Sequence, residues 1–186
     1  MVSKTQRLTG LAVFIALGVL LPMVFHMVGG PGLGRVFLPM HLPVLLAGFF
    51  LGGGPGMVAG AVTPLLSSVL TGMPPLMPPV AQMMVWELAI YGLLAGISYR
   101  RLSLGVYPSL LTALVGGRLV YGLMGWLVLP VFGLTRIRPL FPITAGVVTG
   151  APGIVIQLLL VPAVVYLVER NLRVAPRKRS PSRLGS

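Results

Sequence analysis

Residues 8–28 read LTGLAVFIALGVLLPMVFHMV, a stretch without a single lysine, arginine, aspartate or glutamate. An α-helix rises about 1.5 Å per residue, so roughly 20 apolar residues suffice to cross the ~30 Å hydrocarbon core of a bilayer. Lys4 and Arg7 precede the stretch, as in a secretory signal, but no small-residue cleavage site of the usual form follows. We therefore interpret residues 8–28 as a retained transmembrane helix.

Five more apolar stretches follow the first one. Two are long enough to span a bilayer, residues 107–129 and 145–168, and three are shorter or interrupted, residues 38–51, 56–70 and 80–99. Glycine and proline cluster between them, above all in GGGPG at residues 52–56, where the chain can turn. The sequence predicts an all-α polytopic membrane protein, a bundle of six transmembrane helices in one domain over residues 1–172. Helices two and three should form a hairpin with a short loop.

The composition supports a membrane protein and excludes most enzymes. Apolar residues make up 56% of the chain and charged residues 9%, and the mean hydropathy is +0.98, values that a soluble domain cannot sustain on its surface. Two acidic residues, two histidines and no cysteine leave too few groups for most catalytic sites and no recognisable metal-ligand spacing. We therefore expect no enzymatic activity, no metal and no cofactor.

The net charge of +12 comes from basic residues at the ends of the apolar stretches, where they orient helices and contact anionic lipids. Nucleic acid is therefore not an expected partner. With the N-terminus in the cytoplasm, ten lysines and arginines fall inside and three outside, Arg35, Arg136 and Arg138. We expect a multi-pass protein of the cell membrane with both termini cytoplasmic, ending in a basic, disordered tail at residues 173–186.

Three ionisable side chains fall within the predicted spans: His41, Glu87 and Arg118. Such residues are costly in lipid and indicate a function or a specific partner. Glu87 and Arg118 should lie at similar depth and could neutralise each other, joining helices four and five. Alternatively, Arg118 presents its guanidinium to a ligand carboxylate or phosphate while Glu87 orients it or binds a ligand hydroxyl. Both interpretations hold if the pair forms the floor of a pocket.

Aromatic and polar residues near this pair are candidates for lining such a pocket. Tyr91 lies one turn from Glu87 and Tyr121 one turn from Arg118, and Gln82 and Trp86 belong to the outer half of helix four. His41, near the outer end of helix two, is more typical of a polar residue at the membrane interface than of a ligand contact.

Helix one carries Ala12 and Ala16 four residues apart. This spacing of small residues lets another helix approach closely. Because the two alanines lie near the cytoplasmic end of the helix, they suggest a face for docking a partner.

Several segments together resemble the S components of energy-coupling factor transporters, small six-helix proteins that capture vitamins for an ATP-driven importer. The similar segments are HLPVLLAG at 41–48, PLLSSVLTGMP at 64–74, ELAIYG at 87–92, GRLVYG at 117–122 and PGIVIQL at 152–158. The resemblance covers residues 8 to 169 and is greatest to the subgroup assigned to pantothenate. The long basic tail departs from the compact ends of that family.

The resemblance implies a substrate-binding and translocating subunit whose partners are a transmembrane coupling subunit and two ATPase subunits. It assigns Ala12 and Ala16 to docking on the coupling subunit. It also implies an outer pocket for a vitamin, built from the outer loops and helices four to six, which adds Met73 and Gln157 to the candidate contacts. Pantothenate or another anionic vitamin would suit Arg118.

Two other functions compete with this one. A self-sufficient secondary transporter would need an intramembrane carboxylate that cycles protons, and Glu87 is the sole candidate. A membrane-embedded enzyme would need a paired catalytic constellation or a metal motif, and the sequence shows neither. No glycine loop that cradles phosphate is present, so ATP hydrolysis would have to come from other chains.

Overall fold

The computed structural model describes the backbone of residues 4–77, 80–131, 133 and 141–174, and the side chains of these residues except 31, 33, 35, 141–147 and 172–174. The described chain forms six α-helices and one π-helical turn: α1 (Lys4–Phe37), α2 (His41–Leu51), α3 (Gly53–Thr71), α4 (Val80–Gly96), η1 (Ile97–Arg101), α5 (Val106–Val131) and α6 (Phe141–Val174). The predicted all-α bundle of six helices is confirmed.

Five of these helices are long and apolar enough to cross a membrane. The exception is α2, which has 11 residues and is therefore only about 16 Å long at 1.5 Å per residue. It begins at His41, shortly after Leu38 with a φ of 50°, and ends at Leu51, before Gly52 with a φ of 101°. Gly52 alone separates α2 from α3, which confirms the predicted hairpin.

The helix boundaries differ from the sequence prediction mainly in α1 and α6. The backbone leaves the helical conformation at Gly29 and Gly30, where the prediction ended the first span, but it resumes a helix up to Phe37. Helix α6 begins at Phe141 and extends to Val174, past the predicted end of the bundle. Arg136, Arg138 and the predicted tail beyond Val174 lie outside the described residues.

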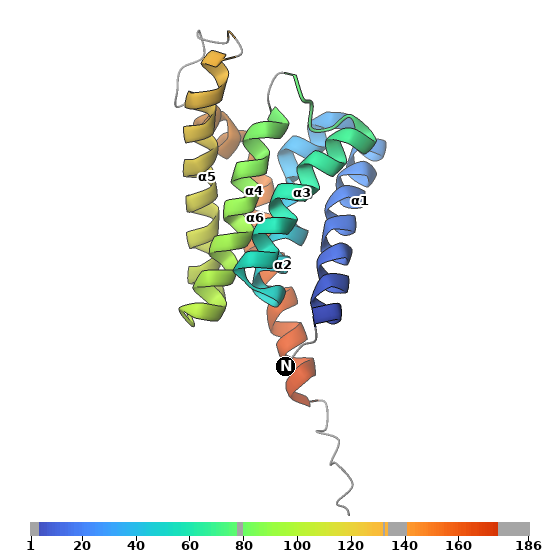
Figure 1. The fold of residues 1–186 in the computed structure, drawn as a ribbon, viewed down its shortest axis with the longest axis vertical. Helices are drawn as coiled ribbons and strands as arrows, with labels where there is room; N and C mark the ends of the chain where they lie inside the picture. Colours follow the sequence, from blue (N-terminus) through green and yellow to red (C-terminus); the bar gives the residue numbers. More distant parts are fainter. Residues whose placement is uncertain (1–3, 78–79, 132, 134–140, 175–186) are drawn as a thin grey trace, which may run out of the picture.

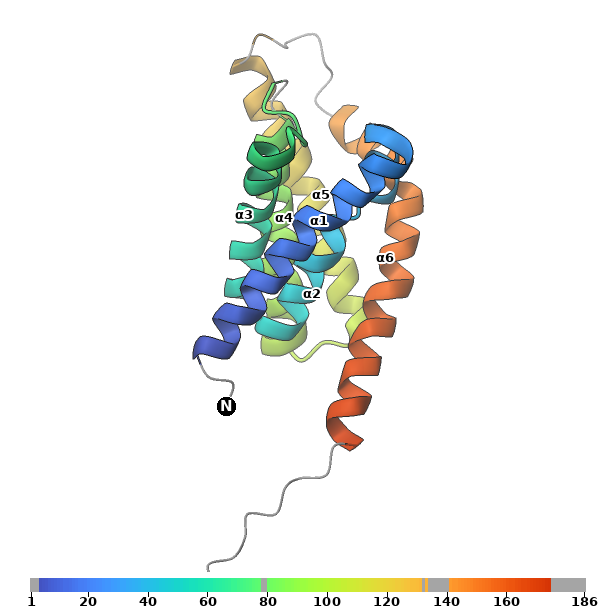
Figure 2. The same cartoon turned by 90° about the vertical axis from the view of Figure 1, so that its right-hand side faces the viewer.

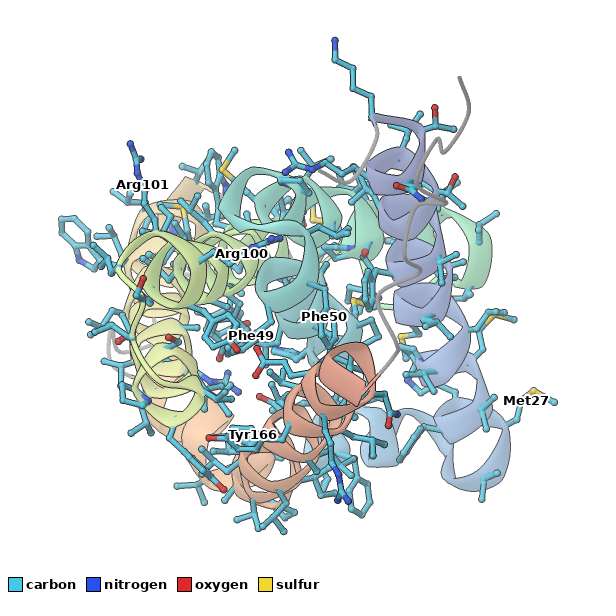
Figure 3. The ribbon with its side chains drawn as sticks, turned by 90° about the horizontal axis from the view of Figure 1, so that it is seen from below. Met27, Phe49, Phe50, Arg100, Arg101 and Tyr166 are labelled. Atoms are coloured by element: carbon cyan, nitrogen blue, oxygen red, sulfur yellow. The ribbon has the colours of Figure 1, made fainter. Side chains whose placement is uncertain are left out.

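The helices alternate in direction, so that the described ends of the chain lie at one end of the bundle (Figures 1 and 2). We call this the basic end, because it carries Lys4, Arg7, Arg100, Arg101 and Arg170. Seen from there, Arg101 points away from the bundle (Figure 3). Arg100 instead donates a hydrogen bond to the carbonyl of Phe50 in α2, at 2.5 Å.

Much of the apolar core lies in the half of the bundle nearest the basic end. Its buried side chains include Leu45 and Phe49 of α2, Ala95 of α4, Leu110 of α5 and Val165 of α6. Each of these residues lies nearer the basic end than the polar residue of its own helix, which is His41 in α2, Glu87 in α4, Arg118 in α5 and Gln157 in α6. At the basic end itself the Tyr99 hydroxyl donates to the Glu169 carboxylate, joining η1 to α6, and the rings of Phe49 and Tyr99 lie 4.9 Å apart.

Helix α4 lies at the centre, in contact with α2, α3 and α5. Glycines permit this packing: a Cβ on Gly56 of α3 would lie 2.5 Å from the Gly92 carbonyl oxygen and 2.7 Å from Gly48 Cα. Gly56 and Gly60, like Gly92 and Gly96, are four residues apart, the spacing at which membrane helices pack backbone to backbone. Three helices therefore meet with almost no side chain between them.

Candidate functional site

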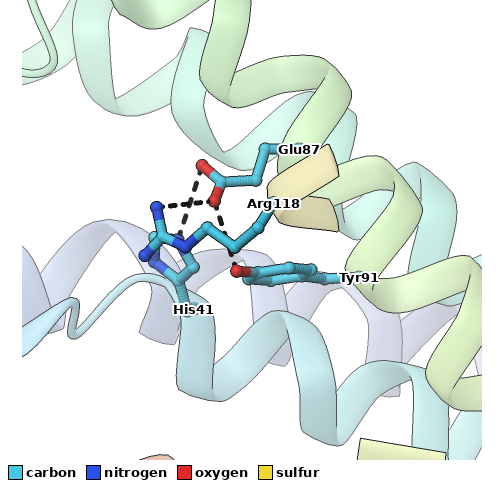
Figure 4. A network of polar contacts seen from close by, with 4 residues as sticks. All are labelled: His41, Glu87, Tyr91 and Arg118. Atoms are coloured by element: carbon cyan, nitrogen blue, oxygen red, sulfur yellow. Dashed lines mark hydrogen bonds and ion pairs between the residues drawn. The ribbon is translucent and has the colours of Figure 1, made fainter. Parts of the chain in front are cut away.

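Glu87 is the centre of a buried polar cluster formed by α2, α4 and α5 (Figure 4). Its side chain is 2% exposed and belongs to α4, so a charged group is buried within the bundle. Oε1 accepts a hydrogen bond from the Tyr91 hydroxyl at 3.2 Å and faces Nη1 of Arg118 at 3.0 Å. The predicted proximity of Glu87 and Arg118 is thus realised as an ion pair that joins α4 to α5.

Arg118 uses only part of its guanidinium in this pair. Nη1 faces Glu87, whereas Nε and Nη2 are buried and have no hydrogen-bond partner among the described residues. Helix α6 passes close to this unpartnered edge, because a Cβ on Gly150 would lie 3.3 Å from Nη2. A side chain at position 150 would crowd the guanidinium, and glycine avoids this contact.

Tyr91 fits beside Arg118 because residue 117 is glycine. A Cβ on Gly117 would overlap the Tyr91 ring, so glycine lets the ring lie directly against α5. The Tyr91 ring also meets the His41 ring, with ring centroids 5.3 Å apart. Local sequence thus sets the cluster: Tyr91 lies one turn from Glu87, and Gly117 directly precedes Arg118.

His41 completes the cluster as the first residue of α2. Its Nε2 lies 3.8 Å from Glu87 Oε2, beyond hydrogen-bond distance, and neither ring nitrogen has a hydrogen-bond partner among the described residues. The residue is 1% exposed. The structure therefore buries His41 inside the bundle rather than leaving it at the membrane interface as the sequence suggested.

Gln157 of α6 is also fully buried, and neither its amide nitrogen nor its oxygen has a partner among the described residues. It follows Gly150 by two turns, so both residues lie on the same face of α6. Buried polar atoms are nearly always hydrogen-bonded, so this amide is a candidate for binding a ligand or a water. Gln157 was a candidate contact only through the resemblance of its segment to the S components, since a single glutamine in an apolar helix is by itself unremarkable.

The remaining predicted contacts lie further from Glu87 or face elsewhere. Gln82 donates to the Leu76 carbonyl at 3.2 Å, and the carbonyl of Met73 accepts bonds from the hydroxyls of Ser67 and Thr71, which fixes the loop after α3. Tyr121 is half-buried on α5. Trp86 is 54% exposed, so the structure does not bring its ring together with Glu87.

Ala12 and Ala16 are exposed on the outer surface of α1. A different face of the same helix packs against α3: a Cβ on Gly18 would lie 2.5 Å from the side chain of Thr63. Ala12 and Ala16 are therefore available to a partner and are not used in packing the bundle.

The fold and the cluster together define a polytopic membrane protein with a charged site buried between its helices. A family model described as the substrate-specific component of ECF transporters matches residues 6–165. The chain therefore belongs to this family, a component of energy-coupling factor transporters and not a family of enzymes. No curated protein and no solved structure matches the chain significantly.

Proposed function

We propose that this subunit captures an anionic, water-soluble vitamin through the free edge of Arg118. The observation that carries the proposal is that Nε and Nη2 are buried without a partner while Nη1 pairs with Glu87. Buried donors of a charged group are costly to leave unsatisfied, by about 1–3 kcal/mol or more. A ligand that supplies two acceptor oxygens would remove this cost.

The free edge has the geometry that a carboxylate requires. Nε and one Nη of a guanidinium form a planar fork that binds both oxygens of a carboxylate. Glu87 occupies the remaining nitrogen, and its contacts hold the guanidinium in one orientation. Under this proposal the two interpretations left open by the sequence hold together, since Glu87 neutralises Arg118 and would also position it for the ligand.

Pantothenate is the vitamin we propose, because the sequence resembles the pantothenate subgroup and because its groups complement the site. Its carboxylate would bind Arg118, and its amide and hydroxyl groups would bind Gln157, whose amide lacks a partner among the described residues. Tyr91, Tyr121, His41, Gln82 and Met73 remain proposed contacts. Trp86 would join them only if its exposed ring turned inward.

The proposed orientation in the membrane follows from the distribution of lysine and arginine. The basic end would face the cytoplasm, with both termini there, because lysine and arginine are enriched on that side of membrane proteins. A transmembrane coupling subunit would dock on the exposed face of α1 at Ala12 and Ala16, and two ATPase subunits would supply the energy.

Binding of radiolabelled pantothenate to purified Arg118→Lys protein tests the ligand contact. Lysine keeps the charge but loses the fork, so we expect affinity to fall about ten- to a hundredfold, equivalent to roughly 1.5–3 kcal/mol. Arg101→Lys, at an exposed arginine of the basic end, is the matched control and should bind like the wild type. Unchanged affinity in Arg118→Lys would show that the guanidinium does not meet the ligand.

Uptake into proteoliposomes separates this function from secondary transport. We expect accumulation only when the coupling subunit and both ATPases are present with ATP. Concentrative uptake by this chain alone, driven by a proton or sodium gradient, would instead support a secondary transporter that uses Glu87. In the structure, Glu87 is held by Arg118 and Tyr91, which favours a fixed role for its carboxylate.

A further inference from the structure

Charge balance in the buried cluster suggests that more than the vitamin enters the site. The carboxylate of Glu87 and the guanidinium of Arg118 cancel each other at 3.0 Å. A ligand carboxylate placed on the free edge of Arg118 would leave one uncompensated negative charge among groups that are shielded from water. Buried charges of this kind are strongly disfavoured unless they are paired.

His41 is the group that can restore neutrality. It is buried 3.8 Å from Glu87 Oε2, and both of its ring nitrogens lack a hydrogen-bond partner among the described residues. A neutral imidazole offers one donor and a protonated one offers two. Histidine is also the side chain whose ordinary change of charge falls between pH 5 and 8.

We propose that the site binds its anionic ligand together with one proton, which His41 takes up from solvent. This inference rests on the proposed function of Arg118. The proton forms an N–H bond on His41, and the ligand enters as a carboxylate, so the occupied site contains two cations and two anions. Ligand release would then be favoured on the side of the membrane where the pH is higher.

The geometry supports a protonated His41 between two anions. Nε2 needs to move by about 1 Å to donate to Glu87 Oε2 at the usual 2.7–2.9 Å of a charge-assisted bond. Oε1 of Glu87 is already engaged by Tyr91 and Arg118, whereas Oε2 faces His41. Nδ1 of His41 remains available for the ligand.

The described surroundings contain few other groups that could take the proton. From α4 the cluster receives Glu87 and Tyr91, and from α5 Arg118. Helix α3 contains no titratable residue. The other helices that contact α2 carry further described titratable side chains, and all of these but one lie at or near the basic end. They are Lys4, Arg7, Tyr99, Arg100, Arg101, Tyr166, Glu169 and Arg170. The exception is His26 on α1. His26 lies against the backbone of Gly34 in α1 itself, with its Nε2 2.5 Å from where a Cβ of Gly34 would be.

Titration calorimetry with pantothenate between pH 5.5 and 8.5 tests the proposal on the wild-type protein. The ligand carboxylate stays ionised throughout, since ordinary carboxyl pKa values lie near 4. We expect the dissociation constant to rise by up to tenfold per pH unit on the alkaline side. In two buffers of different ionisation enthalpy, the apparent binding enthalpies should differ by an amount corresponding to uptake of up to one proton.

Two comparisons identify the origin of the proton linkage. Panthenol, in which a hydroxymethyl group replaces the carboxylate, should bind more weakly and without proton uptake. His41→Gln should remove the pH dependence of pantothenate binding, whereas His26→Gln, at the other histidine of the chain, should retain it. If His41→Gln fails to fold, the wild-type calorimetry and panthenol decide the matter.

The possible failures are distinguishable. Pantothenate binding that is independent of pH and releases or takes up no proton would overturn this inference and leave the proposed function intact. A wild-type pH dependence that persists in His41→Gln would also overturn it, because another group would then carry the proton. No binding of pantothenate at any pH by the folded wild-type protein would refute the proposed function itself.

Discussion

A methyl group added at Gly56 should weaken the junction of α2, α3 and α4. The Cβ of Gly56→Ala would lie 2.5 Å from the Gly92 carbonyl oxygen, and a carbon and an oxygen normally approach no closer than about 3.3 Å. One helix must therefore shift by about 0.8 Å. Overpacking of this kind costs about 1–3 kcal/mol. Gly54→Ala is the control on the same helix, since apart from its chain neighbours nothing lies within 4 Å of a Cβ there.

The two variants share the gain in helix propensity of alanine over glycine, at most about 1 kcal/mol. A Cβ at residue 54 also meets the ring of Pro55, and this contact disfavours the helical conformation before a proline, so the difference between the two variants is a lower bound on the steric cost at Gly56. At about 2–4 °C per kcal/mol for a chain of this size, we expect Gly56→Ala to melt roughly 2–12 °C below Gly54→Ala in detergent, monitored by tryptophan fluorescence. Equal melting temperatures, or a more stable Gly56→Ala, would show that α3 and α4 do not pack backbone to backbone.

Two further sets of substitutions probe the site and the docking face. Glu87→Gln should destabilise the ligand-free protein by roughly 3–5 kcal/mol, because it leaves the guanidinium of Arg118 buried and unpaired. Adding Arg118→Gln should recover much of this loss. Thermal unfolding of the single and double variants checks this, and no recovery in the double variant would argue against the ion pair. Ala12→Leu combined with Ala16→Leu should abolish ATP-driven uptake while the pantothenate dissociation constant stays within a few-fold of the wild type, and an equal loss of binding would mean that the alanines pack inside the subunit.

The sequence predicted the number and order of the helices because hydrophobic stretches in a bilayer must pair their own backbone groups. It was less successful where glycine interrupts an apolar run. Gly29 and Gly30 end the first straight segment as predicted, but the chain resumes a helix beyond them. The spacing of Gly56 with Gly60 and of Gly92 with Gly96 was visible in the sequence and would have predicted the central packing of α3 on α4.

The site was predictable where the helical repeat alone decides position. Glu87 and Tyr91 are one turn apart and do form a hydrogen bond. Trp86 precedes Glu87 by one residue, about 100° around the helix, and this rotation turns its ring toward the outer surface. The burial of His41 and Gln157 depends on which helices cover them, and periodicity in a membrane protein does not reveal this, because lipid-facing and buried positions are both apolar.

The short helix α2 and the apolar core between it and the basic end should also prevent ions from leaking through the subunit. From His41 to the basic end, the interior contains buried apolar side chains such as Leu45, Phe49, Leu110 and Val165. A permeant ion would have to shed its hydration shell to pass this layer. The resting subunit should therefore hold a membrane potential without leak, even though it keeps a charged cluster buried between its helices.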